Sequence, residues 1–270
     1  MAAHGHIPAP RPTAVAVVTG ASSGIGRAIA LELGRRGHNL LLVARTPGPM
    51  EGIRDALPGV TVTVRPCDLA DPDARAELIA ELRDLEVSVI VNSAGIATFG
   101  AFHKLDPGHE RTQFELNATA LFELTAAVLP GMVERHAGGI VNVGSVAGNA
   151  AIPNNATYVG TKALVNTFTE SLHHELRDTG VACTLLAPGP VREEVKADAE
   201  RTVVDRATPD FVWTTYPDCA LDTLAALDAN RMRVVPGGLS KLGNILTTYL
   251  PRRLTAPVLG ALYSRMSETD

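Results

Sequence analysis

Short runs of apolar residues alternate with longer stretches of helical periodicity along most of this chain. The short runs are nearly continuous in apolar residues, as in parallel strands that are covered on both faces. They are predicted as strands at residues 15–19, 39–44, 60–64, 87–92, 139–143, 181–186 and 233–235. The longer stretches are predicted as helices at residues 25–36, 71–84, 110–134 and 155–179.

This alternation predicts a single α/β domain, doubly wound and of the Rossmann type, with a parallel sheet of about seven strands and helices on both faces. We expect a flexible arm over residues 1–12, the catalytic α/β domain over 13–238 with a lid segment at about 190–217, and an amphipathic helical extension over 239–270. The aromatic residues of the lid segment fit two interpretations equally well. They either line an apolar pocket or pack the segment onto the body.

The composition is that of an ordinary soluble domain, with 46% hydrophobic and 20% charged residues among 270. A net charge of −5 does not suit a nucleic-acid surface, which needs clustered basic residues. Three widely spaced cysteines show no metal-binding pattern, so we expect reduced thiols, no metal and a cytoplasmic location. No run of roughly 18 uncharged apolar residues predicts a transmembrane segment.

A glycine-rich turn follows the first predicted strand and opens the first predicted helix. Gly20 and Gly24 let the backbone turn tightly and approach a pyrophosphate, while Gly26 lets the helix pack close to the sheet. The amino end of that helix offers free N–H groups and the positive end of its dipole. A lone turn of this kind can be only a tight connection, but here its place predicts a dinucleotide site. The site comprises Gly20, Ser22, Ser23, Gly24, Ile25 and Gly26.

The ends of the second and third strands indicate which dinucleotide is bound. Enzymes that select NAD commonly place an acidic residue after the second strand, whereas this chain has Ala44 and Arg45 there. A guanidinium can form a forked contact with a 2′-phosphate, so NADP(H) is predicted, with an exposed Arg45 at a strand end as the alternative. Asp68, followed by Leu69, is predicted to accept a hydrogen bond from the adenine amino group or else to cap a helix.

Tyr158 and Lys162, one helical turn apart, suit proton transfer, and Ser145 lies 13 positions upstream. Reducing a carbonyl requires a hydride on carbon and a proton on oxygen. Tyr158 can supply the proton, although an unperturbed phenol titrates near ~10. The Lys162 ammonium is expected to lower that pKa, and Ser145 can hydrogen-bond the substrate oxygen. Separately, these residues could be a surface pair and a turn residue.

In order and spacing these motifs resemble the classical short-chain dehydrogenase/reductase family over residues 15–235. The resemblance rests on the glycine turn, Asn92-Ser93-Ala94-Gly95, Asn117, Ser145, Tyr158-x-x-x-Lys162 and Pro188-Gly189. It implies that Asn117 organises a water-linked proton path to Lys162. It also implies that Asn92, Ala94, Gly95, Tyr158, Lys162, Pro188, Gly189 and Val191 bind the cofactor.

The chain departs from the family pattern at Glu193, where a threonine usually helps to hold the nicotinamide carboxamide. Either the loop is shifted by a residue or closure over the cofactor differs.

The predicted activity is an NADPH-dependent carbonyl reductase or alcohol dehydrogenase. Its expected substrate is an apolar ketone or aldehyde, such as a lipid-like, steroid-like, 3-oxoacyl or polyketide carbonyl. An NAD-dependent alcohol dehydrogenase and a non-catalytic dinucleotide-binding regulator remain alternatives. The resemblance implies a homodimer or homotetramer that pairs through the helices at 110–134 and 155–179.

Overall fold

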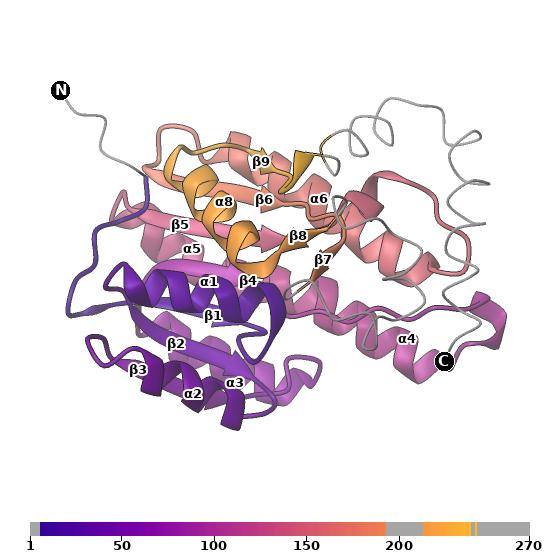
Figure 1. The fold of residues 1–270 in the computed structure, drawn as a ribbon, viewed down its shortest axis with the longest axis horizontal. Coiled ribbons are helices and arrows are strands. Elements are labelled where there is room, and N and C mark those ends of the chain that lie inside the picture. The colour runs from indigo at the N-terminus through magenta and orange to yellow at the C-terminus, as the bar shows by residue number, and fades with distance from the viewer. Residues whose placement is uncertain (1–5, 193–212, 239–240, 242–270) are drawn as a thin grey trace.

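The computed structural model describes residues 6–192, 213–238 and 241 (Figure 1). Its central parallel sheet is built from β1 (Ala14–Thr19), β2 (Asn39–Ala44), β3 (Val62–Pro66), β4 (Glu86–Asn92), β5 (Gly138–Val143), β6 (Val181–Leu186) and β9 (Arg233–Val234). The seven strands lie in the order β3-β2-β1-β4-β5-β6-β9, and every neighbouring pair is parallel. The doubly wound fold predicted from the apolar pattern is therefore confirmed.

Helices cover both faces of this sheet. One face carries α1 (Gly24–Arg35), α2 (Gly48–Ala56) and α8 (Tyr216–Asp228), and Figure 1 shows α1 and α8 in front of the strands. The other face carries α3 (Pro72–Arg83), α5 (Ala120–Glu134) and α6 (Ala156–Glu175). Successive strand side chains point to opposite faces, so two separate apolar cores form.

Three helical features differ from the sequence expectation. Helix α8 was not predicted, and its first two residues fall in the segment expected to be the lid. The structure contains α2, which was not predicted. Gly48, Pro49 and Gly52 are poor helix formers, whereas Met50 and Ile53 are fully buried in the inner face of this helix. The helix expected at 110–134 instead begins with α4 (Pro107–Phe114) and passes through a π-helical turn, Glu115–Thr119, before α5. Turns of this type inside α-helices often mark functional sites.

The continuous helix Pro107–Glu134 is long and apolar enough, by length and composition alone, to cross a membrane. In the structure its α5 part packs against α3 and lies along β4 and β5. The same composition is typical of a helix in the core of a globular domain, and these contacts account for it.

The ends of the chain are described only in part. Residues 6 and 7, within the segment expected as a flexible arm, are hydrogen-bonded to the body: the His6 and Ile7 N–H groups donate to Asp228 at 2.9 and 3.2 Å. Arg11 forms an ion pair with Glu86. The central part of the expected lid (193–212), with Glu193 and Phe211, and nearly all of the expected extension (239–240 and 242–270) lie outside the described residues.

Two short strands belong to the described ends of the expected lid segment. Val191–Arg192 (β7) and Thr214–Thr215 (β8) pair in parallel as a separate two-stranded sheet. The Arg192 guanidinium lies 5.3 Å from the centre of the Trp213 ring, within the range of a cation–π contact. These contacts hold the two described ends of the segment together.

Candidate active site

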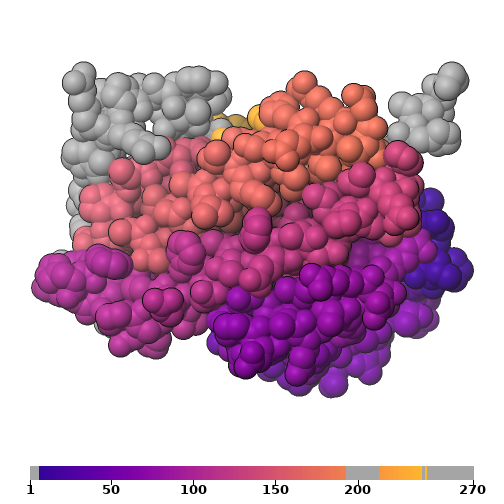
Figure 2. Space-filling view, turned by 180° about the vertical axis from the view of Figure 1, so that it is seen from behind, coloured from indigo at the N-terminus to yellow at the C-terminus, as the bar shows by residue number. Residues whose placement is uncertain are grey.

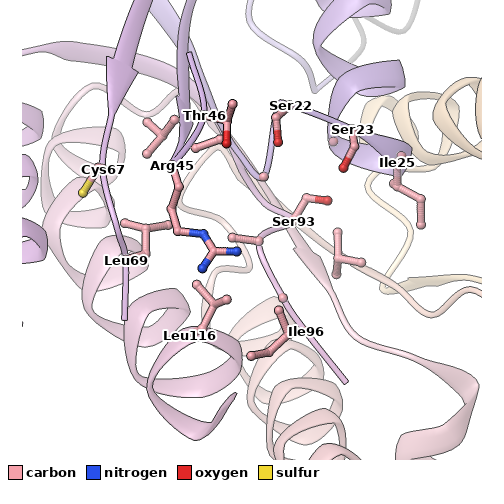
Figure 3. Close-up of a pocket in the computed structure, with 18 of the residues that line it drawn as sticks. Ser22, Ser23, Ile25, Arg45, Thr46, Cys67, Leu69, Ser93, Ile96 and Leu116 are labelled. Atoms are coloured by element: carbon pink, nitrogen blue, oxygen red, sulfur yellow. The ribbon is translucent and has the colours of Figure 1, made fainter. Parts of the chain in front are cut away.

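A cleft of about 390 Å³ lies at the carboxyl ends of the central strands (Figure 3). Because parallel strands end at one edge of a sheet, loops that are distant in sequence meet there. Twelve of the residues predicted to bind a dinucleotide line this cleft. They are Gly20, Ser22, Ser23, Gly24, Ile25, Gly26, Arg45, Asp68, Leu69, Ala94, Gly95 and Val191.

The glycines of the first turn have little room for a side chain. Gly20 and Gly24 adopt positive φ values of 65° and 55°, which glycine accepts without strain. A Cβ atom on Gly20 would lie 2.9 Å from the Ala94 backbone, and one on Gly26 would lie 2.4 Å from the Gly20 carbonyl oxygen. The turn therefore brings bare backbone to the cleft. The Ser23 side chain makes no capping hydrogen bond at the start of α1, so the helix end remains able to bind an anion.

Two charged residues belong to the cleft lining in the described part of the chain, Arg45 and Asp68. Figure 3 shows the Arg45 side chain turned into the cleft, between Leu69 and Leu116 on one side and the glycine turn on the other. Asp68 uses Oδ1 to accept from the Ala70 N–H at 3.0 Å. The cap of α3 is Asp71, so the alternative of a helix-capping role for Asp68 does not apply.

Arg75 was not predicted as a site residue, but it contacts the cleft lining at Leu69. Its side chain is 4% exposed and makes ion pairs with Glu115 at 3.2 Å and Glu123 at 2.6 Å. It also donates to the Leu69 carbonyl oxygen at 2.8 Å. Arg75 therefore ties the loop of Asp68 and Leu69 to the π-helical turn. Its ion-pair partners lie 40 and 48 positions away in the sequence, so no local pattern could have revealed them.

Lys162 does not line the cleft but is hydrogen-bonded to a residue that does. Its Nζ donates to the carbonyl oxygen of Val143, a cleft residue, at 2.8 Å, and lies 5.7 Å from the centre of the Tyr158 ring. Its side chain is buried, and the resulting loss of hydration lowers the pKa of the ammonium to about 8. A lysine with this pKa can change charge near neutral pH.

Tyr158 and Ser145 are brought together by the fold. Their side chains share a hydrogen bond, and the Tyr158 ring packs against Ala147, Ala150 and Ile152. Burial raises the pKa of Tyr158, while the Ser145 hydrogen bond acts in the opposite direction. The expected lowering of this pKa by Lys162 is therefore not found in the structure. Loss of hydration dominates, and the Lys162 ammonium is directed at the Val143 carbonyl.

Asn117 lies in the π-helical turn and is almost completely buried. Its amide oxygen accepts from the Ile96 N–H and its amide nitrogen donates to the Ile96 carbonyl, both at 2.9 Å. A third hydrogen bond of 3.2 Å reaches Thr161 on α6. The side chain thus ties the loop after β4 to the helix that carries Tyr158 and Lys162.

Five of the predicted cofactor residues do not line the cleft: Asn92, Tyr158, Lys162, Pro188 and Gly189. The Asn92 side chain points into the core instead, where it donates to Thr125 and Asn142 at 3.0 and 2.9 Å. The Pro188 carbonyl accepts from Val146, next to Ser145.

The cleft is also lined by residues that were not predicted to bind a cofactor. They are Val43, Ala44, Thr46, Cys67, Ser93, Ile96, Leu116, Val143 and Tyr216. Most end a strand or follow one directly, and that position was the available signal. Tyr216, considered only as a lid aromatic, lies near Gly24: a Cβ there would be 3.7 Å from its ring.

A family model described as short chain dehydrogenase matches residues 14–203. A very-long-chain 3-oxoacyl-CoA reductase of Caenorhabditis elegans is 38% identical over 183 residues, which are 64% of this chain and 58% of that protein. The chain therefore spans less than two thirds of that relative. An NADP-dependent 3-hydroxy acid dehydrogenase of Salmonella typhi is 35% identical over 66% of this chain and 72% of its own length.

A similar solved structure is that of a bulky-bulky ketone specific alcohol dehydrogenase from Comamonas testosteroni. It is 28% identical, with a TM-score of 0.74 over 96% of each chain.

Proposed function

The chain belongs to the short-chain dehydrogenase family, and we propose that it is an NADPH-dependent reductase of an apolar ketone or 3-oxoacyl carbonyl. It is an oxidoreductase by family. The single observation that carries the choice of NADPH is Arg45, which directly follows β2 and turns into the cleft. The relative from Salmonella typhi is NADP-dependent.

The cleft suits a dinucleotide in shape and charge. A Cβ on Gly20 or Gly26 would clash with the Ala94 backbone or the Gly20 carbonyl oxygen, so these glycines keep the first turn tight, and the amino end of α1 favours a pyrophosphate. Arg45 would hold a 2′-phosphate through two parallel hydrogen bonds. Asp68, with one carboxylate oxygen committed to Ala70, would accept from the adenine amino group through the other. A bound NADPH supplies the hydride.

The remaining chemistry belongs to Tyr158, Ser145 and Lys162, which do not line the cleft; Lys162 is hydrogen-bonded to Val143, which does. Because burial raises its pKa, Tyr158 keeps its proton at neutral pH and can donate it to a substrate oxygen. Ser145 would bind the same oxygen and stabilise charge that develops there. Lys162 would hold the cofactor ribose and supply positive charge beside Tyr158. These roles favour the reductive direction.

The substrate class is proposed from the apolar surroundings of Tyr158. Ala147, Ala150 and Ile152 form a small buried cluster against its ring. This surface suits a hydrocarbon next to a carbonyl better than a polar metabolite. The similarity to a 3-oxoacyl-CoA reductase and to an alcohol dehydrogenase for bulky ketones supports this choice.

A homodimer through α5 and α6 is part of the proposal. Phe122 on α5 and Leu164 on α6 are 53% and 42% exposed, and Phe122 makes an edge-on contact with Phe168 of α6. Figure 2 shows this side of the molecule, where the two helices lie next to each other. Large exposed apolar side chains on adjacent helices are typical of an interface.

The test is a fluorescence titration of the purified protein with NADPH and with NADH. We expect micromolar NADPH binding, NADH binding at least about tenfold weaker, and loss of this preference in Arg45→Ala. Each factor of ten in the ratio of the NADH and NADPH dissociation constants corresponds to about 1.4 kcal/mol of binding free energy. Arg54→Ala, which changes an exposed arginine of α2 outside the cleft lining, is the matched control. NADH binding as tight as NADPH binding would refute the cofactor assignment.

A further inference from the structure

Four polar side chains lie along one stripe of α6, at intervals of four residues: Tyr158, Lys162, Asn166 and Glu170. Residues spaced in this way share a helix face. Lys162 holds the Val143 carbonyl at the end of β5, and Tyr158 is hydrogen-bonded to Ser145. Asn166 continues the same series, although neither the family motifs nor the cleft lining includes it.

Asn166 binds the backbone of Ser145 on both sides. Its Nδ2 donates to the Ser145 carbonyl oxygen at 2.9 Å, and its Oδ1 accepts from the Ser145 N–H at 3.3 Å. A second bond from Nδ2 reaches Asn149 at 3.2 Å. The residue is 3% exposed, so water competes little for these groups.

Two glycines make this contact possible. A Cβ atom on Gly144 would lie 2.0 Å from the Asn166 amide oxygen, and one on Gly148 would lie 2.7 Å from its amide nitrogen. Because Gly144 and Gly148 have no side chains, the Asn166 amide can approach the backbone on both sides of Ser145. A side chain at Gly144 or Gly148 would displace the Asn166 amide.

The stripe continues to the edge of the sheet. Glu170, one turn beyond Asn166, pairs with Arg233 of β9 at 2.9 Å. Arg233 also donates to Asn149 at 3.2 Å. The turn that carries Ser145 is thus anchored both to α6 and, through Asn149, to β9.

We propose that Asn166 is a positioning residue, which fixes the backbone of Ser145 so that its hydroxyl meets Tyr158 and the substrate oxygen. This inference rests on the proposed reductase activity. The Ser145 hydroxyl also accepts from the Ala147 N–H at 3.1 Å, and its carbonyl accepts from Gly148. Those contacts lie within the turn and move with it. The bonds from Asn166 connect the turn to the helix that carries Tyr158.

The test is a double-mutant cycle in NADPH-dependent reduction of a ketone that the wild-type protein turns over. Ser145→Ala is expected to lower kcat about 10² to 10³-fold. Asn166→Ala is expected to lower kcat about 10 to 100-fold, with the KM for NADPH changed by less than about twofold. In the Ser145→Ala background, Asn166→Ala should cost less than about twofold, because the hydroxyl that it positions is gone.

Thr169→Val is the matched control. Thr169 is also buried on α6, and its hydroxyl accepts from the Asn142 side chain of β5 at 3.1 Å and donates to the Val165 carbonyl at 2.6 Å, rather than bonding to Ser145. It should lower thermal stability while leaving kcat within about threefold of wild type. Asn166→Asp, which keeps the size and the acceptor oxygen, replaces Asn166→Ala should the latter fail to fold.

A pH profile separates positioning from a general loss of structure. Since the Ser145 hydrogen bond lowers the pKa of Tyr158, Asn166→Ala and Ser145→Ala should both move the rise of alcohol oxidation to higher pH. Thr169→Val should not. Additive losses in the cycle, or an unmoved pH profile in Asn166→Ala, would overturn the inference. A wild-type protein that binds NADPH but reduces no ketone would instead count against the proposed function.

Discussion

Removing the charge of Lys162 should change the pH dependence of folding in a predictable window. The pKa of this buried ammonium is lowered from 10.5 to about 8. Between these values the unfolded chain holds a proton that the folded chain has released, so stability rises with pH. Below pH 8 the folded protein bears the whole cost of a buried charge, and above 10.5 it bears none.

The magnitude follows from the size of this shift. A difference of two to three pKa units at about 1.36 kcal/mol each amounts to about 3 kcal/mol. The wild-type protein should therefore gain about 3 kcal/mol of unfolding free energy relative to Lys162→Met between pH 7.5 and 10.5. The hydrogen bond to Val143, which methionine cannot make, adds an offset that is the same at both ends of this range.

The assay is urea unfolding of both proteins at half-unit steps of pH. Titration of all other groups cancels in the difference between the two curves. The control is Lys104→Met, which changes an exposed lysine. The difference between its free energy of unfolding and that of the wild type should not depend on pH. A flat difference for Lys162→Met as well would show that the ammonium keeps its ordinary pKa, and would refute the argument from burial.

Two further predictions concern the proposed proton donor Tyr158 and the buried Arg75. Tyr158→Phe should lower kcat for ketone reduction about 10² to 10⁴-fold, the usual contribution of a general acid, while the Kd for NADPH by fluorescence stays within about twofold. A loss of NADPH affinity as large as the loss of kcat would contradict the assigned role. Arg75→Met should lower stability by about 2 kcal/mol, because Glu115 and Glu123 lose a shared cation but stay partly hydrated. It should also weaken NADPH binding through the freed loop at Leu69, as measured by the same titration; unchanged affinity would limit Arg75 to a role in folding.

Strand positions could be predicted because burial on both faces leaves a direct trace in sequence. In β2, for example, apolar residues are almost uninterrupted. Helix α2 left a weaker trace, since Gly48, Pro49 and Gly52 favour a turn locally and only packing of Met50 and Ile53 against the body favours a helix. Tertiary contacts overrode local preference there.

The sequence by itself determined the sheet, the glycine turn and the place of Arg45 at the end of a strand, because these depend on periodicity and on strand ends. The tertiary structure decided the surroundings of the individual polar side chains. It sent Asn92 into the core, raised the pKa of Tyr158 by burial, and joined Asn166 to Ser145 across 21 positions of sequence. Hydration and side-chain partners depend on residues distant in the chain, so they are settled only when the helices close over the sheet.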